Sequence, residues 1–127
     1  MNKLGQLYFD AAGGNHNAVV FITAFHAYCH AIDDLVDGDV PFTPEAFLDV
    51  MMQANSLYST PFYIDNWFRL QPVIAQITST YADSVAWEKA DEEWKRQTSD
   101  VLRLCGNDMI LQVAWIIGGY KHMRAIS

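Results

Sequence analysis

The sequence is poor in positive charge. Eight lysine and arginine residues stand against fifteen aspartate and glutamate residues, which gives a net charge of −7 over 127 residues. No cluster of lysine and arginine interrupts this acidic background. Because an acidic surface repels phosphate backbones and anionic headgroups, we expect neither nucleic-acid binding nor docking on an anionic membrane.

Cysteine is also scarce, and the two cysteines lack the CxxC spacing of metal and redox sites. We interpret Cys29 and Cys105 as small buried thiols in a reducing compartment, with a single disulfide as the open alternative. The N-terminal MNKLGQLYFDAA has no long apolar stretch, so we expect no signal peptide. Residues 11–32 carry no formal charge but hold too many polar side chains for a membrane span. These features predict a cytoplasmic protein.

Turn signals are few, and no alternating strand pattern of useful length occurs. Repeats, low-complexity tracts and Ser/Gly linkers are lacking as well, so we expect one domain over residues 1–127. The long stretches between turn signals predict an all-α fold. We expect a compact bundle of four main helices around a central apolar first long helix, with a short helix before Gly13.

Capping residues and breakers set the expected ends of the main helices. These helices are expected at about residues 17–38, 44–58, 65–88 and 91–117. Pro72 should kink the third helix or mark its true start. Nothing obvious breaks the chain between Ala82 and Leu104, so the continuity of the third and fourth helices stays open.

The stretch HAYCHAIDDLVDGD, residues 26–39, ends the first long helix with an unusual set of polar residues. At about 100° per residue, five of them share one stripe. These five are His26, His30, Asp33, Asp34 and Asp37. Carboxylates four residues apart can share Mg²⁺, or alternatively Mn²⁺, and histidines at the same spacing can bind a transition metal. The stripe therefore predicts a metal site, with Asp33 and Asp37 as the catalytic pair.

The same stripe also fits the solvated face of an amphipathic helix, with each histidine hydrogen-bonded beside a cavity. Two observations favour the site. The stripe contains no Lys, Glu or Arg, and Val19 and Ile22 continue it toward the N-terminus, which predicts a buried start. On one flank of the stripe, bulky residues such as Phe21 should fill a core, and on the other, Ala27 and Ala31 allow a neighbouring helix to approach closely.

The stretch AVVFITAFHAYCHAIDDLVDG, residues 18–38, resembles the first aspartate-rich helix of the squalene and phytoene synthases. The motif of that family is matched here by Tyr28-Cys29, by the run Asp33-Asp34-Leu35-Val36-Asp37 and by Gly38. The resemblance implies an all-α fold in which Asp33 and Asp37 hold Mg²⁺ against a prenyl diphosphate, with Asp34 in support. No second Asp-xxx-Asp motif follows downstream.

A second, weaker similarity is to the all-α nucleoside triphosphate pyrophosphohydrolases, in which acidic pairs on facing helices bind Mg²⁺. The segment Asp34-Leu-Val-Asp37 is similar to the second of those pairs. The first pair has no counterpart here, because no acidic residue lies between Asp10 and Asp33. This similarity implies Mg²⁺-dependent cleavage of a phosphoanhydride.

Basic side chains later in the chain are candidates for substrate binding. Arg103 shares a helical stripe with Asn107 and could grip a phosphate. Its alternative is an ion pair with Asp100, three residues earlier. The C-terminal GGYKHMRAIS adds Lys121 and Arg124, and its two glycines would let the chain turn back as a lid.

Two functions follow from these patterns. The first is Mg²⁺-dependent binding or hydrolysis of a small-molecule phosphate ester or diphosphate, in a homodimer whose Asp clusters face each other across a two-fold axis. The second is a non-enzymatic helical protein that acts through homo-oligomer or partner contacts.

Overall fold

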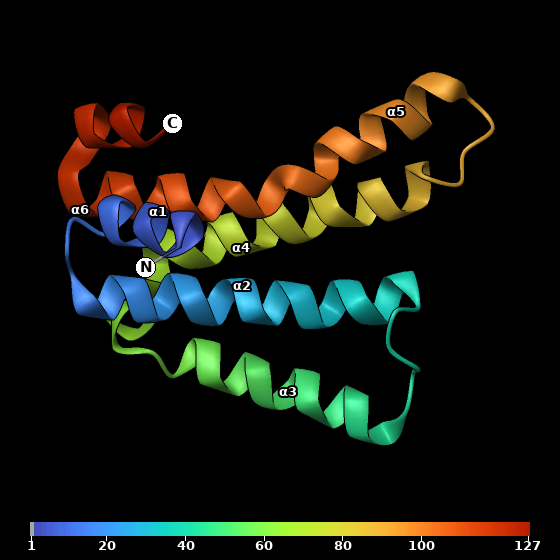
Figure 1. Ribbon diagram of the computed structural model, residues 1–127, viewed down its shortest axis with the longest axis horizontal. Coiled ribbons are helices and arrows are strands. Elements are labelled where there is room, and N and C mark those ends of the chain that lie inside the picture. The colour runs from blue at the N-terminus through green and yellow to red at the C-terminus, as the bar shows by residue number, and fades with distance from the viewer. Residues whose placement is uncertain (1) are drawn as a thin grey trace. The chain divides into compact units, whose positions relative to one another are not determined.

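The computed structural model describes residues 2–127, and within that range the chain forms helices and no strand (Figure 1). The helices are α1 (Lys3–Ala11), α2 (His16–Asp37), α3 (Pro44–Tyr58), α4 (Pro61–Trp87), α5 (Glu93–Leu102), the 3₁₀ helix η1 (Arg103–Gly106) and α6 (Asn107–Ile126). The all-α fold class is confirmed, and so is the short helix before Gly13. The chain divides into two compact units, residues 1–67 and 68–127, and a single domain stays a prediction.

The ends of α2 and α3 follow their capping residues. The side chain of Asn15, two residues before the expected start of this helix, accepts a hydrogen bond of 3.1 Å from the backbone N–H of Ala18. Gly38 ends α2 with a φ of 78°, a left-handed conformation that glycine adopts without strain. Thr43 caps α3 in the same way, at 3.1 Å from the N–H of Ala46, ahead of the proline in the first turn.

The third predicted helix differs from the observed α4 at its start and at its kink. It begins at Pro61 rather than near residue 65, and Pro72 lies within it. The non-helical residue is Asn66, with φ −129° and ψ 18°. Its side-chain amide donates to the carbonyl oxygen of Phe62 at 3.0 Å, which stabilises the local break.

The predicted fourth helix is three elements. Residues 88–92 form a turn that separates α4 from α5, so the two helices do not merge. Arg96 donates to the carbonyl oxygens of Ala90 and Asp91 at 2.6 and 2.8 Å, which fixes this turn. Next, η1 interrupts the helix up to Gly106. The last helix, α6, bends at Gly119, where φ is 80° and ψ is −168°.

In the first unit, α2 supplies the centre of the apolar core. Phe21 and Phe25 are buried, as their place on the bulky flank predicts. The ring of Phe21 lies 5.7 Å from that of Phe62 and 6.3 Å from that of Tyr63. Ile22 is fully buried too, so the start of the polar stripe is covered as expected. The neighbouring helix α3 runs back alongside α2 (Figure 1).

Two stretches are long and apolar enough to cross a membrane, judged by length and composition alone. They are His16–Asp37 and Glu93–Ile126, each with a mean hydropathy of 1.3. The core helices of many proteins pass the same test, so this finding is weak evidence. The expected absence of a membrane span stays a prediction.

Candidate functional site

The five residues of the predicted metal stripe do not share one site, and His26 has a partner of its own. Its Nδ1 lies 2.5 Å from the hydroxyl oxygen of Tyr8, and the two rings are 5.1 Å apart. Burial raises the pKa of Tyr8, and the nearby Cys29 raises it further. The phenol therefore stays protonated and can donate to Nδ1. This is the hydrogen-bonded role that the sequence left as the alternative to metal binding.

His30 and Asp34 line a groove between α2 and α3 with a volume of about 290 Å³. Ala27 and Ala31, on the small flank of α2, form one wall. Asp49 lies on the opposite wall, which α3 supplies. The other lining residues are Leu35, Val40, Ala46, Val50 and Gln53. The groove is therefore lined by both polar and apolar side chains.

Asp33 and Asp37 do not belong to the lining of this groove. Asp33 is half-buried and Asp37 is exposed. Across residues 2–127, no group of three or more His, Cys, Asp or Glu side chains could hold a metal ion. The predicted ligands are therefore not gathered around one point, and the assignment of Mg²⁺ or Mn²⁺ to them stays a prediction.

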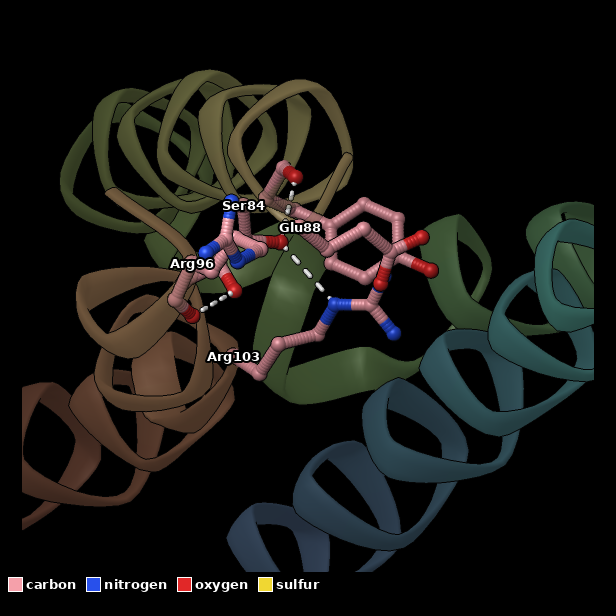
Figure 2. A network of polar contacts seen from close by, with 6 residues as sticks. Ser84, Glu88, Arg96 and Arg103 are labelled. Carbon is pink, nitrogen blue, oxygen red and sulfur yellow. Dashed lines mark hydrogen bonds and ion pairs between the residues drawn. The ribbon is translucent and has the colours of Figure 1, made fainter. Parts of the chain in front are cut away.

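The predicted phosphate-binding residues all lie in the second unit, and Arg103 has partners there (Figure 2). One of its terminal nitrogens lies 2.6 Å from Oε2 of Glu88, and its Nε donates to the hydroxyl oxygen of Ser84 at 3.1 Å. Its guanidinium lies 5.3 Å from the centre of the Tyr81 ring. The salt bridge to Glu88 joins η1 to the turn that follows α4, whereas the sequence suggested Asp100 as the partner.

Two buried serines of the second unit, Ser84 and Ser99, also form hydrogen bonds, and Figure 2 shows Ser84 beside Arg103. The hydroxyl of Ser84 donates to the carbonyl oxygen of Tyr81, and that of Ser99 donates to the carbonyl oxygen of Arg96, both at 2.6 Å. Because buried polar groups are costly when unpaired, these bonds stabilise the fold. The contacts of Arg103 hold η1 against α4, and the Ser99 bond stabilises α5 locally, so both have a structural role.

The remaining candidates for phosphate binding are exposed. Asn107 is the first residue of α6, and Lys121 and Arg124 follow the bend at Gly119. Figure 1 shows the C-terminal turns folded back at this bend, so the turn predicted at the two glycines is confirmed. A Cβ at Gly118 would lie 2.6 Å from Cβ of His122, so both glycines are needed there. The lid role stays a prediction.

The sequence interpretation missed an apolar surface on α3. We call it the α3 face, and it consists of Phe42, Phe47, Leu48, Met51 and Met52. These residues are 74%, 50%, 57%, 49% and 62% exposed, respectively. The rings of Phe42 and Phe47 lie 6.4 Å apart, so the segment before α3 continues the face. In the sequence, the apolar residues of this helix cover a wider arc than a single buried side needs, which indicates a second apolar side.

The two units also differ in charge, which the net charge of the whole chain does not show. Residues 1–67 carry eight acids and a single basic side chain, Lys3, so the first unit accounts for the entire net charge of −7. In residues 68–127, acids and basic residues balance at seven each. The α3 face therefore lies on the acidic unit.

In comparisons with known protein families, with curated proteins and with solved structures, nothing matched this chain. The resemblances of residues 18–38 to the squalene and phytoene synthases, and of Asp34 and Asp37 to the pyrophosphohydrolases, stay predictions. The α3 face and the groove beside it are the features of the first unit from which a function can be argued.

Proposed function

We propose that this protein is a non-catalytic helical protein that binds another macromolecule through the α3 face. The observation that supports this most is that α3 is apolar on two sides. Its inner side, with Ala46, Val50 and the fully buried Leu57, is used within the first unit. Its outer side is the exposed α3 face. Because a contiguous exposed apolar surface is normally covered, the outer side is suited to a partner.

The size of the α3 face supports the same proposal. Assuming about 200 Å² for a fully exposed residue of this size, its five members leave on the order of 500 Å² in contact with water. The largest apolar patch of an ordinary monomer is roughly 300–600 Å² and is often functional. A stable protein contact buries about 800 Å² on each partner, so the α3 face would supply much of one side.

Selection of helical peptides from a displayed library tests this function. The target is the purified protein, and the counter-target is a Phe47→Gln, Met51→Gln double variant. We expect enriched peptides that lose at least tenfold in affinity on the double variant, as truncation of central contact residues usually causes. A Leu4→Gln variant, at an exposed position on α1, is the matched control. Enriched peptides that bind the double variant as well as the wild type, or no enrichment, would contradict the proposal.

A second candidate is Mg²⁺-dependent binding or hydrolysis of a diphosphate-containing small molecule. The groove supports it, because His30, Asp34 and Asp49 line a single hollow. Under this function Mg²⁺ or Mn²⁺ binds the native state and raises the melting temperature by mass action. An Asp34→Asn, Asp49→Asn variant should lose that rise, because these two carboxylates line the groove. Melting curves that are identical with and without the cations would rule this candidate out.

We also propose that the chain as a whole forms a compact four-helix bundle in a cytoplasmic protein. A homodimer is one way to cover an apolar surface. Its first units would each carry the net charge of −7, however, so their contact would be repulsive. A different partner therefore fits the α3 face better.

A further inference from the structure

We infer that the α3 face binds a basic amphipathic helix of another protein. This inference rests on the proposed function of the face as a contact surface, and it adds the chemical class of the partner. It is supported by three features of the first unit: the shape of the apolar arc, the acids along its edge and the lack of basic residues around it.

The apolar arc on α3 has the width of a helix-binding surface. With Phe47 at 0° and about 100° per residue, Met51 lies at 40°, Leu48 at 100° and Met52 at 140°. Asn55 follows at about 80° and ends the arc toward the C-terminus. The apolar stripe of a partner helix, with residues at i, i+3, i+4 and i+7, matches such an arc. The two methionines can adjust to the side chains they meet.

Acids follow one edge of this arc. On the same wheel Glu45 lies at about 160° and Asp49 at about 200°, just beyond Met52. Both are exposed. A partner helix seated on the arc would lay one polar flank against these carboxylates. Lysine or arginine on that flank gains Coulomb energy, whereas glutamate or aspartate is repelled.

No basic side chain of the first unit offsets these acids. The sequence has no lysine or arginine between Lys3 and Arg69. A second copy of the first unit would bring the same acids against the edge, and an anionic membrane would be repelled in the same way. Apolar surface beside uncompensated negative charge is therefore complementary to a helix that is apolar on one side and basic on the other.

Fluorescence anisotropy with two defined peptides tests this inference. Both are helical and about 18 residues long, five turns. They share the same leucine stripe, and the polar positions are lysine in one and glutamate in the other. We expect the lysine peptide to bind at least tenfold more tightly than the glutamate peptide at low ionic strength. The difference should shrink as salt is added, because exposed charges are screened.

Variants locate the binding. Glu45→Gln with Asp49→Gln should weaken the lysine peptide about fivefold at low salt, as expected for two exposed ion pairs. The control is Asp83→Asn with Asp100→Asn in the second unit, which removes the same net charge and should leave affinity within twofold. Phe47→Gln with Met51→Gln should weaken binding more than tenfold at every salt concentration. If that pair fails to fold by circular dichroism, Leu48→Gln with Met52→Gln replaces it.

Other occupants of the α3 face would give different results in these experiments. If the glutamate peptide binds as tightly and depends on Phe47 and Met51, the basic partner is wrong while the proposed function stands. A lysine peptide that binds regardless of those two residues overturns both. Light scattering that shows a dimer lost on Phe47→Gln, Met51→Gln identifies a second copy as the occupant, and binding to phosphatidylserine vesicles identifies a membrane. Either of these results overturns the inference.

Discussion

Arg103 contacts three groups on α4 and on the turn that follows it. It pairs with Glu88, donates to Ser84 and lies over the ring of Tyr81. Ser84 is fully buried, and the Arg103 side chain is 20% exposed. Hydrogen bonds in such surroundings contribute more than those of surface pairs. Arg103, which the sequence suggested as a phosphate ligand, therefore holds η1 against α4.

Replacing Arg103 by methionine, which keeps the aliphatic length, should lower the free energy of unfolding by about 1–3 kcal/mol. Glu88→Gln should cost about 0.5–1 kcal/mol, because this side chain is the more exposed partner. The double variant should cost less than the sum of the two, since they share a salt bridge. Urea unfolding measures all three. Wild-type stability of Arg103→Met would show that the side chain has no fastening role.

Cys105 is a buried free thiol that donates to the carbonyl oxygen of Ile77 at 3.7 Å. Neither cysteine forms a disulfide, so the structure does not contain the one that the sequence left open, and Cys29 is half-buried rather than buried as expected. Burial raises the pKa of the Cys105 thiol, and the charge of Asp108 raises it further. At any neutral or mildly alkaline pH, less thiolate is therefore present than for an ordinary cysteine.

In a Cys29→Ser background, we expect the native thiol of Cys105 to react with a disulfide reagent at least tenfold more slowly than in denaturant. Burial screens the sulfur from the reagent, and the raised pKa lowers the thiolate fraction as well. The native rate should rise as pH is increased from 7 to 9, because the thiolate is the reacting form. Equal native and denatured rates at pH 8 would mean that the thiol is accessible.

At the scale of helices, capping residues predicted more than the apolar periodicity did. Gly38 and the Thr43-Pro44 pair end and begin helices where expected. The breaks at Asn66 and at η1 were not predictable. The first depends on a hydrogen bond from a side chain to the backbone, and the second is fastened by Arg103 to a residue fifteen positions away. Spacing along one helix carries no information on such partners.

Gly119 holds the C-terminal bend of α6 in a conformation that other residues rarely adopt, with φ 80° and ψ −168°. Gly119→Ala should therefore cost roughly 1–3 kcal/mol locally, and amide exchange over residues 119–126 should speed up at least tenfold.

Gly106→Ala is the matched control for this change. Gly106 has ordinary helical angles, φ −59° and ψ −25°. Alanine there should be neutral or stabilise the protein by about 0.5–1 kcal/mol. Unchanged exchange in Gly119→Ala would mean that the bend does not depend on the glycine.

At the scale of the whole molecule, the division of charge between the two units decides what kind of partner is acceptable. The sequence shows the excess of acidic residues, but it does not show that they lie beside an exposed apolar surface. The α3 face is recognised only once α2 is seen to cover the opposite side of α3. Phe47 and Met51 look like core residues on a helical wheel. That Asp34 and Asp49 line the same groove could not be predicted for a similar reason, since they belong to different helices.

Methionine methyl spectra give the most direct test of the α3 face. Five methionines are present, and their ¹³C-labelled methyl groups can be followed by NMR while the lysine peptide is added. The account predicts that the signals of Met51 and Met52 shift and saturate, while that of the fully buried Met109 in the second unit stays in place. Saturable binding that leaves the signals of Met51 and Met52 unmoved would contradict it.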